Sequence, residues 1–189
     1  MDFSLPPELD DLAAEARDLG REWAARSDIA EESWIVGHDV EVAKELAARG
    51  WIGMTWPTGH GGGGRSVLER FVVFEALISA GAPIAASWFA DRQIGPTLLE
   101  FGTPEQRERF LPGMLSGEAM WGIGMSEPDA GSDVASIRTR AVRDGDRFVV
   151  DGQKVWTSGA AHADYVYLVA RTDPDAPPHQ GLSELIVDL

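Results

Sequence analysis

The chain has 189 residues, enough for one full domain or for one domain and part of a second, and its 44% hydrophobic content favours a packed globular core. Its 31 acidic and 16 basic residues give a formal net charge of −15. This charge disfavours general binding to nucleic acid or to an anionic membrane, because both need a basic face. The absence of cysteine excludes disulfides, thiolate catalysis and cysteine-based metal sites.

The first seven residues lack the basic and apolar regions of a signal peptide, and no uninterrupted apolar stretch is long enough to span a membrane. We therefore expect a soluble, cytoplasmic globular protein. An anionic small molecule stays compatible with the acidic composition, because helix N-termini, turn amides and single arginines can hold phosphates.

The first part of the chain has helical periodicity. Five apolar residues recur at three- and four-residue steps and define one face of a first helix: Leu9, Leu12, Ala16, Leu19 and Trp23. Asp39 can cap a second helix, which ends at Gly50. Ser66 and Glu69 form a capping-box pattern ahead of residues 67–80. That helix is apolar almost all round, so we expect it inside a bundle.

A last helix begins at residues 103–106, where Thr is the cap and Pro takes the first helical position, and Pro112 ends or kinks it. The period of the apolar residues changes near Ala119. We therefore predict an α-helical domain over residues 1–118 and a β-domain over residues 119–189.

The second domain has the short alternating segments of an antiparallel sheet. Tight turns are predicted at Asp144-Gly145 and at Asp151-Gly152. Strands are predicted, in chain order, at residues 138–143, 147–150, 154–156, 165–170 and 185–189. The fold class is therefore α+β, an N-terminal α-helical bundle followed by a partial antiparallel β-barrel-like domain.

The chain ends in an apolar strand, residues 185–189. Such a strand exposes an unpaired edge, which soluble proteins usually avoid. We therefore expect the sequence to be a truncated piece of a longer protein.

Several familiar motifs are excluded. The glycine tract 60–66 follows Trp56-Pro57 instead of a strand and lacks the Lys of a phosphate loop, so it is interpreted as a link between helices. Gly122-Ile123-Gly124 has Glu127 where a dinucleotide fingerprint needs its third glycine. The four histidines lack metal-ligand spacing, so no metal site is predicted, and no serine lies in a G-x-S-x-G elbow.

The segment 124–136, Gly-Met-Ser-Glu-Pro-Asp-Ala-Gly-Ser-Asp-Val-Ala-Ser, is more informative. Pro128 removes a donor, Gly131 permits a positive φ, and Ser126 and Ser132 offer hydrogen bonds. On these grounds alone, a structural turn and a ligand-binding loop are equally open.

This segment resembles the signature of the acyl-CoA dehydrogenase family: a small residue, an aliphatic residue, Ser or Thr, Glu, two free positions, a small residue, Gly, Ser or Thr, and Asp. Residues 154–159, Lys-Val-Trp-Thr-Ser-Gly, resemble the family's second flavin strand. Trp56-Pro57 with the glycine tract, and residues 102–106 with 110–112, are similar to landmarks of its helical domain. The resemblance covers essentially the whole chain, in family order.

The resemblance implies an oxidoreductase and flavoprotein. A glutamate would remove the α-proton of an acyl-CoA thioester while a hydride leaves the β-carbon for N5 of FAD. Such a site needs hydrogen-bond donors at N5 and at the pyrimidine carbonyls, and an apolar wall that excludes water.

By position in the motifs, the implied flavin contacts are Ile123, Met125, Ser126, Trp156, Thr157 and Ser158. Ser126 would donate a hydrogen bond to the flavin through its hydroxyl, and the backbone amides around Ile123 and Met125 would contribute. Trp156 would pack against the isoalloxazine; the alternative is that it is a core aromatic. Ser158 would donate near N5. The family often has Ile-Thr where this chain has Thr157-Ser158, so either hydroxyl could face the flavin. Ser132 matches a residue that contacts the CoA part of the substrate.

The resemblance also implies what is missing. The family's catalytic glutamate, and the segments that hold the FAD pyrophosphate and adenine, lie in a C-terminal four-helix domain that this sequence lacks. Glu127 is interpreted as a turn residue and not as the base. No catalytic residue is therefore predicted in this chain, and we expect the chain alone to be inactive and to bind FAD weakly.

Two alternatives stay open: a flavin oxidase or monooxygenase on the same scaffold, and a non-catalytic short partner subunit of a heteromeric dehydrogenase. The resemblance further implies a homodimer, tetramer or heteromer, an acyl-CoA substrate from fatty acid and lipid metabolism, and an electron-transferring flavoprotein or similar acceptor. The sequence of residues 154–159 resembles that of bacterial members that act on long-chain or sterol-derived acyl-CoA.

Overall fold

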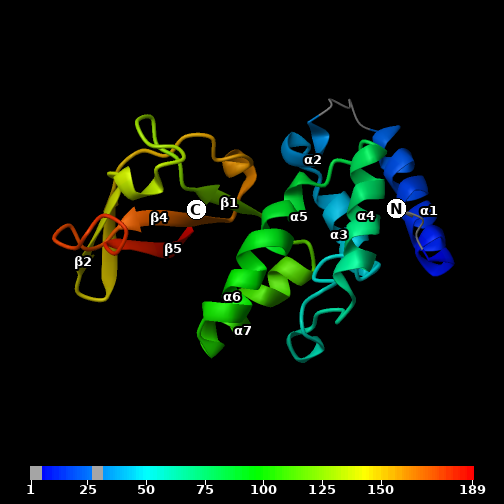
Figure 1. Ribbon diagram of the computed structural model, residues 1–189, viewed down its shortest axis with the longest axis horizontal. Helices are drawn as coiled ribbons and strands as arrows, with labels where there is room; N and C mark the ends of the chain where they lie inside the picture. Colours follow the sequence, from blue (N-terminus) through cyan, green and yellow to red (C-terminus); the bar gives the residue numbers. More distant parts are fainter. Residues whose placement is uncertain (1–5, 27–31) are drawn as a thin grey trace. The chain divides into compact units, whose positions relative to one another are not determined.

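The computed structural model in Figure 1 describes residues 6–26 and 32–189. The chain divides into two compact units, the first ending at Met120 and the second running from Trp121 to Leu189. Within the described ranges, no helix is both long enough and apolar enough to cross a membrane. The signal-peptide prediction falls mainly on residues 1–5, which lie outside these ranges.

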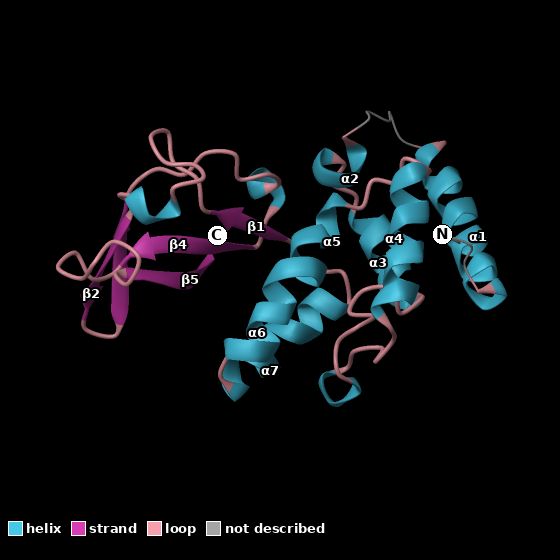
Figure 2. Ribbon diagram, in the orientation of Figure 1, coloured by secondary structure: helices cyan, strands magenta, loops and turns pink. Residues whose placement is uncertain are grey.

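The first unit is helical (Figure 2). Its helices are α1 (Pro7–Ala24), α2 (Ser33–Val36), α3 (Val40–Ala48), α4 (Val67–Ser79), α5 (Ala85–Phe89), α6 (Gly95–Phe101) and α7 (Pro104–Leu115), with a short 3-10 helix η1 (Thr58–His60) and a π-helical turn η2 (Ala90–Ile94). The four helices predicted from periodicity and caps correspond to α1, α3, α4 and α7. The short helices α2, α5 and α6 carry no cap signal of their own and were not predicted.

Local capping chemistry explains where three of the helices begin. The Asp39 carboxylate accepts hydrogen bonds from two amides in the first turn of α3. At α4, the Ser66 amide donates to Glu69 (2.8 Å) and the Glu69 amide donates to the Ser66 hydroxyl (3.1 Å). The same reciprocal pair joins Thr103 and Gln106 at the start of α7. These predicted starts are confirmed.

The core of the first unit forms where α1, α3 and α4 meet the segment that follows α3. Its largest fully buried side chains include Leu46, Trp51, Met54 and Leu77, and full burial of one large apolar side chain stabilises a fold by about 1.5–3 kcal/mol. The prediction that α4 lies inside the bundle holds for only part of the helix. Its buried face is central and C-terminal, whereas its first turns expose Val67, Leu68 and Phe71.

The π-helical turn η2 buries a carboxylate in this core. Asp91, which is 2% exposed, accepts a hydrogen bond from the Gly53 amide (2.7 Å) and is paired with the Arg70 guanidinium, whose Nε lies 3.1 Å away. Gly95 follows directly, and a Cβ there would stand 2.1 Å from the Trp56 ring. One ion pair and one glycine therefore hold the loop after α3 against α4 and α6.

The second unit is a five-stranded sheet. The strands are β1 (Trp121–Gly124), β2 (Arg140–Asp144), β3 (Arg147–Asp151), β4 (Tyr165–Arg171) and β5 (Leu182–Asp188), in the order β1-β4-β2-β3, with β5 also paired to β4. The α+β class is confirmed, but the sheet is mixed and open. The pairs β2–β3 and β4–β5 are antiparallel as expected, whereas β1 runs parallel to β4 and β2 meets β4 in parallel at one residue pair.

The hairpin of β2 and β3 forms as predicted, in antiparallel register with Val142 opposite Val149. Gly145 in its turn has a φ of +64°, which favours glycine. The ladder between the hairpin and β4 has one residue pair, Arg140 with Arg171. Every residue of β3 is exposed.

The predicted strand at residues 154–156 does not form. Gly152 (φ +155°) and Trp156 (φ +60°) take backbone conformations outside the β region and turn the chain away from the ladder. A Cβ at Gly152 would stand 2.3 Å from the Thr139 hydroxyl, so the chain passes close to the start of β2 there. Residues 152–157 therefore form a loop that passes close to the start of β2.

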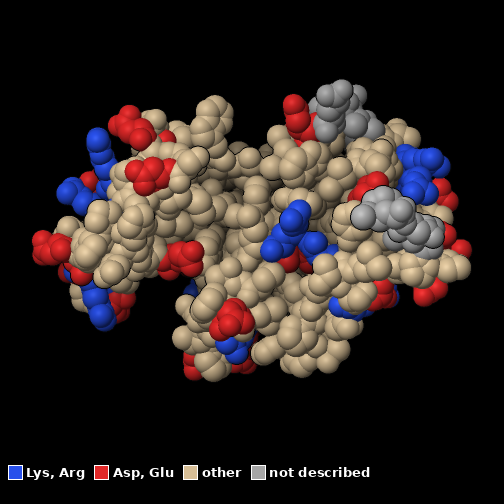
Figure 3. All heavy atoms as spheres, in the orientation of Figure 1, with Lys and Arg blue, Asp and Glu red and all other residues tan. Residues whose placement is uncertain are grey.

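Charges of both signs are interspersed on the face of each unit drawn in Figure 3. That view contains no continuous basic surface of the kind that nucleic-acid binding requires.

Candidate functional site

The signature segment begins where β1 ends. After Gly124 the chain leaves the sheet, and Glu127 and Ala130 close a tight turn through two backbone hydrogen bonds of 2.7 and 3.1 Å. Of the residues implied as flavin contacts, Ile123 and Ser126 are half-buried and Met125 is 39% exposed. Residues 123–126 therefore lie at or near the surface of the second unit, where β1 ends.

A buried ion pair fixes this turn to the loop that carries the second motif. Lys154 Nζ donates to Glu127 Oε1 at 2.9 Å and to the Met125 carbonyl at 2.8 Å. The two ionic side chains are only 10% and 7% exposed. The Val155 amide also donates to the Ser126 carbonyl at 2.9 Å. The two motifs are thus joined side by side, although they are far apart in the sequence.

Glu127 is held as an anion. Its carboxylate accepts hydrogen bonds from the amides of Arg138 (2.7 Å) and Thr139 (2.8 Å) in addition to Lys154. Burial alone raises the pKa of a carboxyl group, but the Thr139 hydroxyl, these two amides and the ammonium group outweigh it and lower the pKa of Glu127 to about 2. A carboxylate with this pKa and these partners holds a turn and is a poor base at neutral pH.

Trp156 lies on the outside of the unit. It is 89% exposed, the highest value among the large hydrophobic residues described, and it is the one non-glycine residue among them with a positive φ (+60°). A left-handed backbone costs a bulky residue about 1–3 kcal/mol and persists where the surroundings impose it. Trp156 is therefore no core aromatic, and the loop presents its indole to solvent.

The two hydroxyl residues follow in a compact turn. The Ser158 amide donates to the Trp156 carbonyl (2.9 Å), and the Ala160 amide donates to the Thr157 carbonyl (3.2 Å). Thr157 and Ser158 are both half-buried. A Cβ at Gly122 would meet the Thr157 methyl group at 3.3 Å, so that methyl packs over β1. Which hydroxyl faces a ligand stays a prediction.

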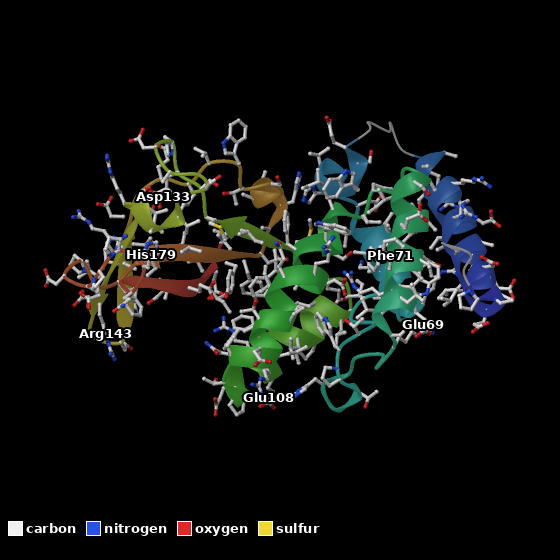
Figure 4. All side chains as sticks on the ribbon, in the orientation of Figure 1. Glu69, Phe71, Glu108, Asp133, Arg143 and His179 are labelled. Carbon is white, nitrogen blue, oxygen red and sulfur yellow. The ribbon has the colours of Figure 1, made fainter. Side chains whose placement is uncertain are left out.

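Ser132 lies on the exposed loop next to Asp133, which Figure 4 labels. The loop is ordered by Ser136, whose amide and hydroxyl both donate to the Asp133 carbonyl (3.1 and 2.8 Å). Beside the Glu127 turn, a hollow of about 300 Å³ is lined by charged and polar groups, among them Asp129, Arg138, Arg140, Asp151 and Gln153.

Sequence reasoning missed the clamp of Lys154 on Glu127. The signal was present, because each motif contributes one member of the pair, but spacing along the chain does not show that the two residues meet. No cluster of side chains able to hold a metal ion occurs in residues 6–26 and 32–189.

Residues 6–118 match the acyl-CoA dehydrogenase N-terminal domain, and residues 122–189 match the acyl-CoA dehydrogenase middle domain. The chain belongs to the acyl-CoA dehydrogenase family. It is 43% identical over 150 residues to acyl-CoA dehydrogenase FadE26 of Mycobacterium tuberculosis, a match that covers 78% of this chain and 37% of that protein.

Two solved structures of the family extend the likeness to the fold. The Tcur3481-Tcur3483 steroid ACAD has a TM-score of 0.90 and 44% identity, over 100% of this chain and 49% of that one. The ChsE4-ChsE5 complex from Mycobacterium tuberculosis has a TM-score of 0.84 and 36% identity, over 100% of this chain and 48% of that one. The chain thus spans about half of the solved chains, and less of the curated relative.

Proposed function

We propose that this chain forms the flavin-facing wall of an FAD-dependent acyl-CoA dehydrogenase, an oxidoreductase that introduces an α,β double bond into an acyl-CoA thioester. The observation that carries the proposal is the outward presentation of Trp156 by a strained loop. Soluble proteins rarely hold a large aromatic side chain in solvent on a strained backbone unless it meets a ligand or a partner.

The exposed groups fit a flavin ring. An isoalloxazine needs a flat apolar surface on one face and hydrogen-bond donors along its edge. Trp156 offers the first, and the half-buried hydroxyls of Ser126, Thr157 and Ser158 offer the second. The bond from the Val155 amide to the Ser126 carbonyl keeps these groups on adjacent segments. When bound, FAD supplies the acceptor for the hydride.

The residues implied as flavin and substrate contacts would then divide the binding of FAD and acyl-CoA among them. Ser126, with the peptide groups around Ile123 and Met125, would donate to the pyrimidine end of the ring. Ser158 or Thr157 would donate near N5, where reduction places negative charge. Trp156 would exclude water, and Ser132 would contact the CoA portion of the substrate.

We assign no base within this chain. Glu127 is not a candidate, because a carboxylate with a pKa of about 2 has little affinity for a proton at neutral pH, and Lys154 occupies one of its oxygens. The α-proton would be removed by a glutamate supplied from outside this sequence. The isolated chain should therefore bind FAD weakly and leave acyl-CoA unchanged.

A titration with FAD tests this proposal. The purified chain should perturb the flavin absorbance and quench its fluorescence, and Trp156→Ala should weaken binding by about tenfold, as the loss of one stacked aromatic worth about 1.4 kcal/mol predicts. Phe101→Ala is the matched control, because Phe101 is 80% exposed but lies in the helical unit. A chain without any flavin response, or equal binding by the Trp156→Ala variant, would refute the proposal.

We further propose, as a second candidate, that the chain is one subunit of a heteromeric acyl-CoA dehydrogenase acting on a steroid-derived acyl-CoA. The supporting observation is its likeness to the ChsE4-ChsE5 complex and to the Tcur3481-Tcur3483 steroid ACAD, each of which is named for two components. Native mass spectrometry after co-expression with a full-length acyl-CoA dehydrogenase should show a mixed assembly with bound FAD. Separate species without mixed masses would exclude this candidate.

A further inference from the structure

Two buried glycines, Gly122 and Gly124, lie on one face of β1. Alternate residues of a strand point to the same face, so the two positions leave neighbouring gaps in the side-chain layer there. A glycine inside a strand often marks the close approach of another part of the backbone. The pattern Gly-Ile-Gly does not fit a dinucleotide fingerprint, so a close approach to β1 is the first explanation to test against the contacts.

The loop that carries the second motif fills both gaps. A Cβ at Gly122 would stand 3.3 Å from the methyl group of Thr157. A Cβ at Gly124 would stand 3.4 Å from Cγ of Lys154. The aliphatic stem of Lys154 thus passes over Gly124, and its ammonium group then reaches the Met125 carbonyl at 2.8 Å. Residues 154–157 therefore lie against the face of β1 that has no side chains at these two positions.

These contacts fix the chain on both sides of Trp156. Before it, the Val155 amide donates to the Ser126 carbonyl at 2.9 Å. After it, the Thr157 methyl lies over Gly122. The one residue between these fixed points has a φ of +60° and is 89% exposed. A strained backbone persists where the surrounding contacts impose it, and here the contacts on either side account for the outward turn of the indole.

We propose that Gly122 and Gly124 are positioning residues for the flavin-facing wall. They leave the space in which residues 154–157 lie against β1, and this packing holds the Trp156 indole in its outward position. The inference rests on the proposed function, because the glycines act on the flavin through Trp156. They are assigned no contact with the flavin of their own.

Gly122→Val tests the proposal by filling the gap, because added methyl groups in a buried site force their neighbours to move. Hydrogen exchange of the Val155 amide should become about tenfold faster, since its bond to the Ser126 carbonyl opens more often. The affinity for FAD should fall by about tenfold, as it does when the indole itself is removed. Circular dichroism and the thermal midpoint establish that the variant is folded.

Gly131→Val is the matched control within the first motif. Among the described residues, no atom lies within 4 Å of a Cβ placed at Gly131, apart from its chain neighbours. The same substitution there should leave both the exchange of the Val155 amide and the affinity for FAD unchanged.

Gly122→Ala supplies a milder change that keeps the test valid if Gly122→Val does not fold. Its Cβ would meet the Thr157 methyl at 3.3 Å, closer than an ordinary contact, so the affinity for FAD should fall by about threefold. Thr157→Ser removes that methyl group but keeps the hydroxyl. The double variant should therefore bind FAD like Thr157→Ser alone, and this recovery measures the coupling between the two positions.

The outcomes separate this inference from the proposed function. If the original chain gives no flavin response, the proposed function fails and this inference fails with it. If the original chain binds FAD and a folded Gly122→Val or Gly122→Ala variant binds it equally well, only the positioning role is refuted. An equal loss in Gly131→Val, or no recovery in the double variant, would also overturn the positioning role.

Discussion

Replacement of Lys154 by methionine tests the central role of the buried ion pair. The change keeps the aliphatic stem but removes donors to Glu127 (2.9 Å) and to the Met125 carbonyl (2.8 Å). Breaking a buried pair by removing one partner costs about 3–5 kcal/mol. Glu127 retains two amide donors, so we expect the lower end, about 3 kcal/mol, in the free energy of unfolding of the second unit.

The matched control is Arg140→Met. Arg140 pairs with Asp151 at 2.8 Å, a similar distance, but both side chains are about two-thirds exposed (65% and 69%). Exposed pairs contribute about 0–1 kcal/mol, so this variant should stay close to the original chain. Urea unfolding at neutral pH, combined with amide hydrogen exchange of residues 125–139, measures both changes and assigns them to the second unit.

The same pair predicts a dependence on pH. The pKa of Glu127 is about 2 in the fold against an ordinary value of 4.5, so its stabilising contribution is complete above about pH 4.5 and is lost as the pH falls towards 2. A difference of this size corresponds to about 3 kcal/mol. Glu127→Gln should remove most of this acid dependence. If Lys154→Met unfolds like Arg140→Met, or Glu127→Gln keeps the full dependence, the clamp is not a main support of the site.

Three further changes test the helical unit. Asp91→Asn should lower its stability by about 3 kcal/mol in urea unfolding, because the Arg70 guanidinium then lacks its charged partner; a loss below about 1 kcal/mol would contradict this. Gly95→Ala should cost at least about 2 kcal/mol, since its Cβ would stand 2.1 Å from the Trp56 ring, and an unchanged thermal midpoint would show that the ring moves freely. Asp39→Ala should cost about 1 kcal/mol through the lost helix cap, whereas Asp39→Asn should cost little.

The elements best predicted from the sequence are those set by neighbouring residues. Asp39, Ser66 and Thr103 start helices because their side chains bond amides two or three residues away, and such spacing is visible in the sequence. The β2–β3 hairpin follows from its turn and alternating residues in the same way.

The features that were missed depend on contacts between distant residues. The parallel pairing of β1 with β4 joins Trp121 to Tyr165, and no local pattern records it. Asp91 meets Arg70 and Gly53 only after the helices pack. The left-handed backbone of Trp156 runs against the preference of its residue type, so the sequence favoured a strand where the fold imposes a loop.

The position of Lys154 also limits how the two motifs can change independently. One ammonium group of the second motif holds the carbonyl of Met125 and the carboxylate of Glu127 in the first, so changes in either motif disturb the same contact. Substitutions in the two segments should therefore have non-additive effects, with a second loss costing less once the first has freed the loop. We therefore expect a graft of either segment into another scaffold to need the other segment with it.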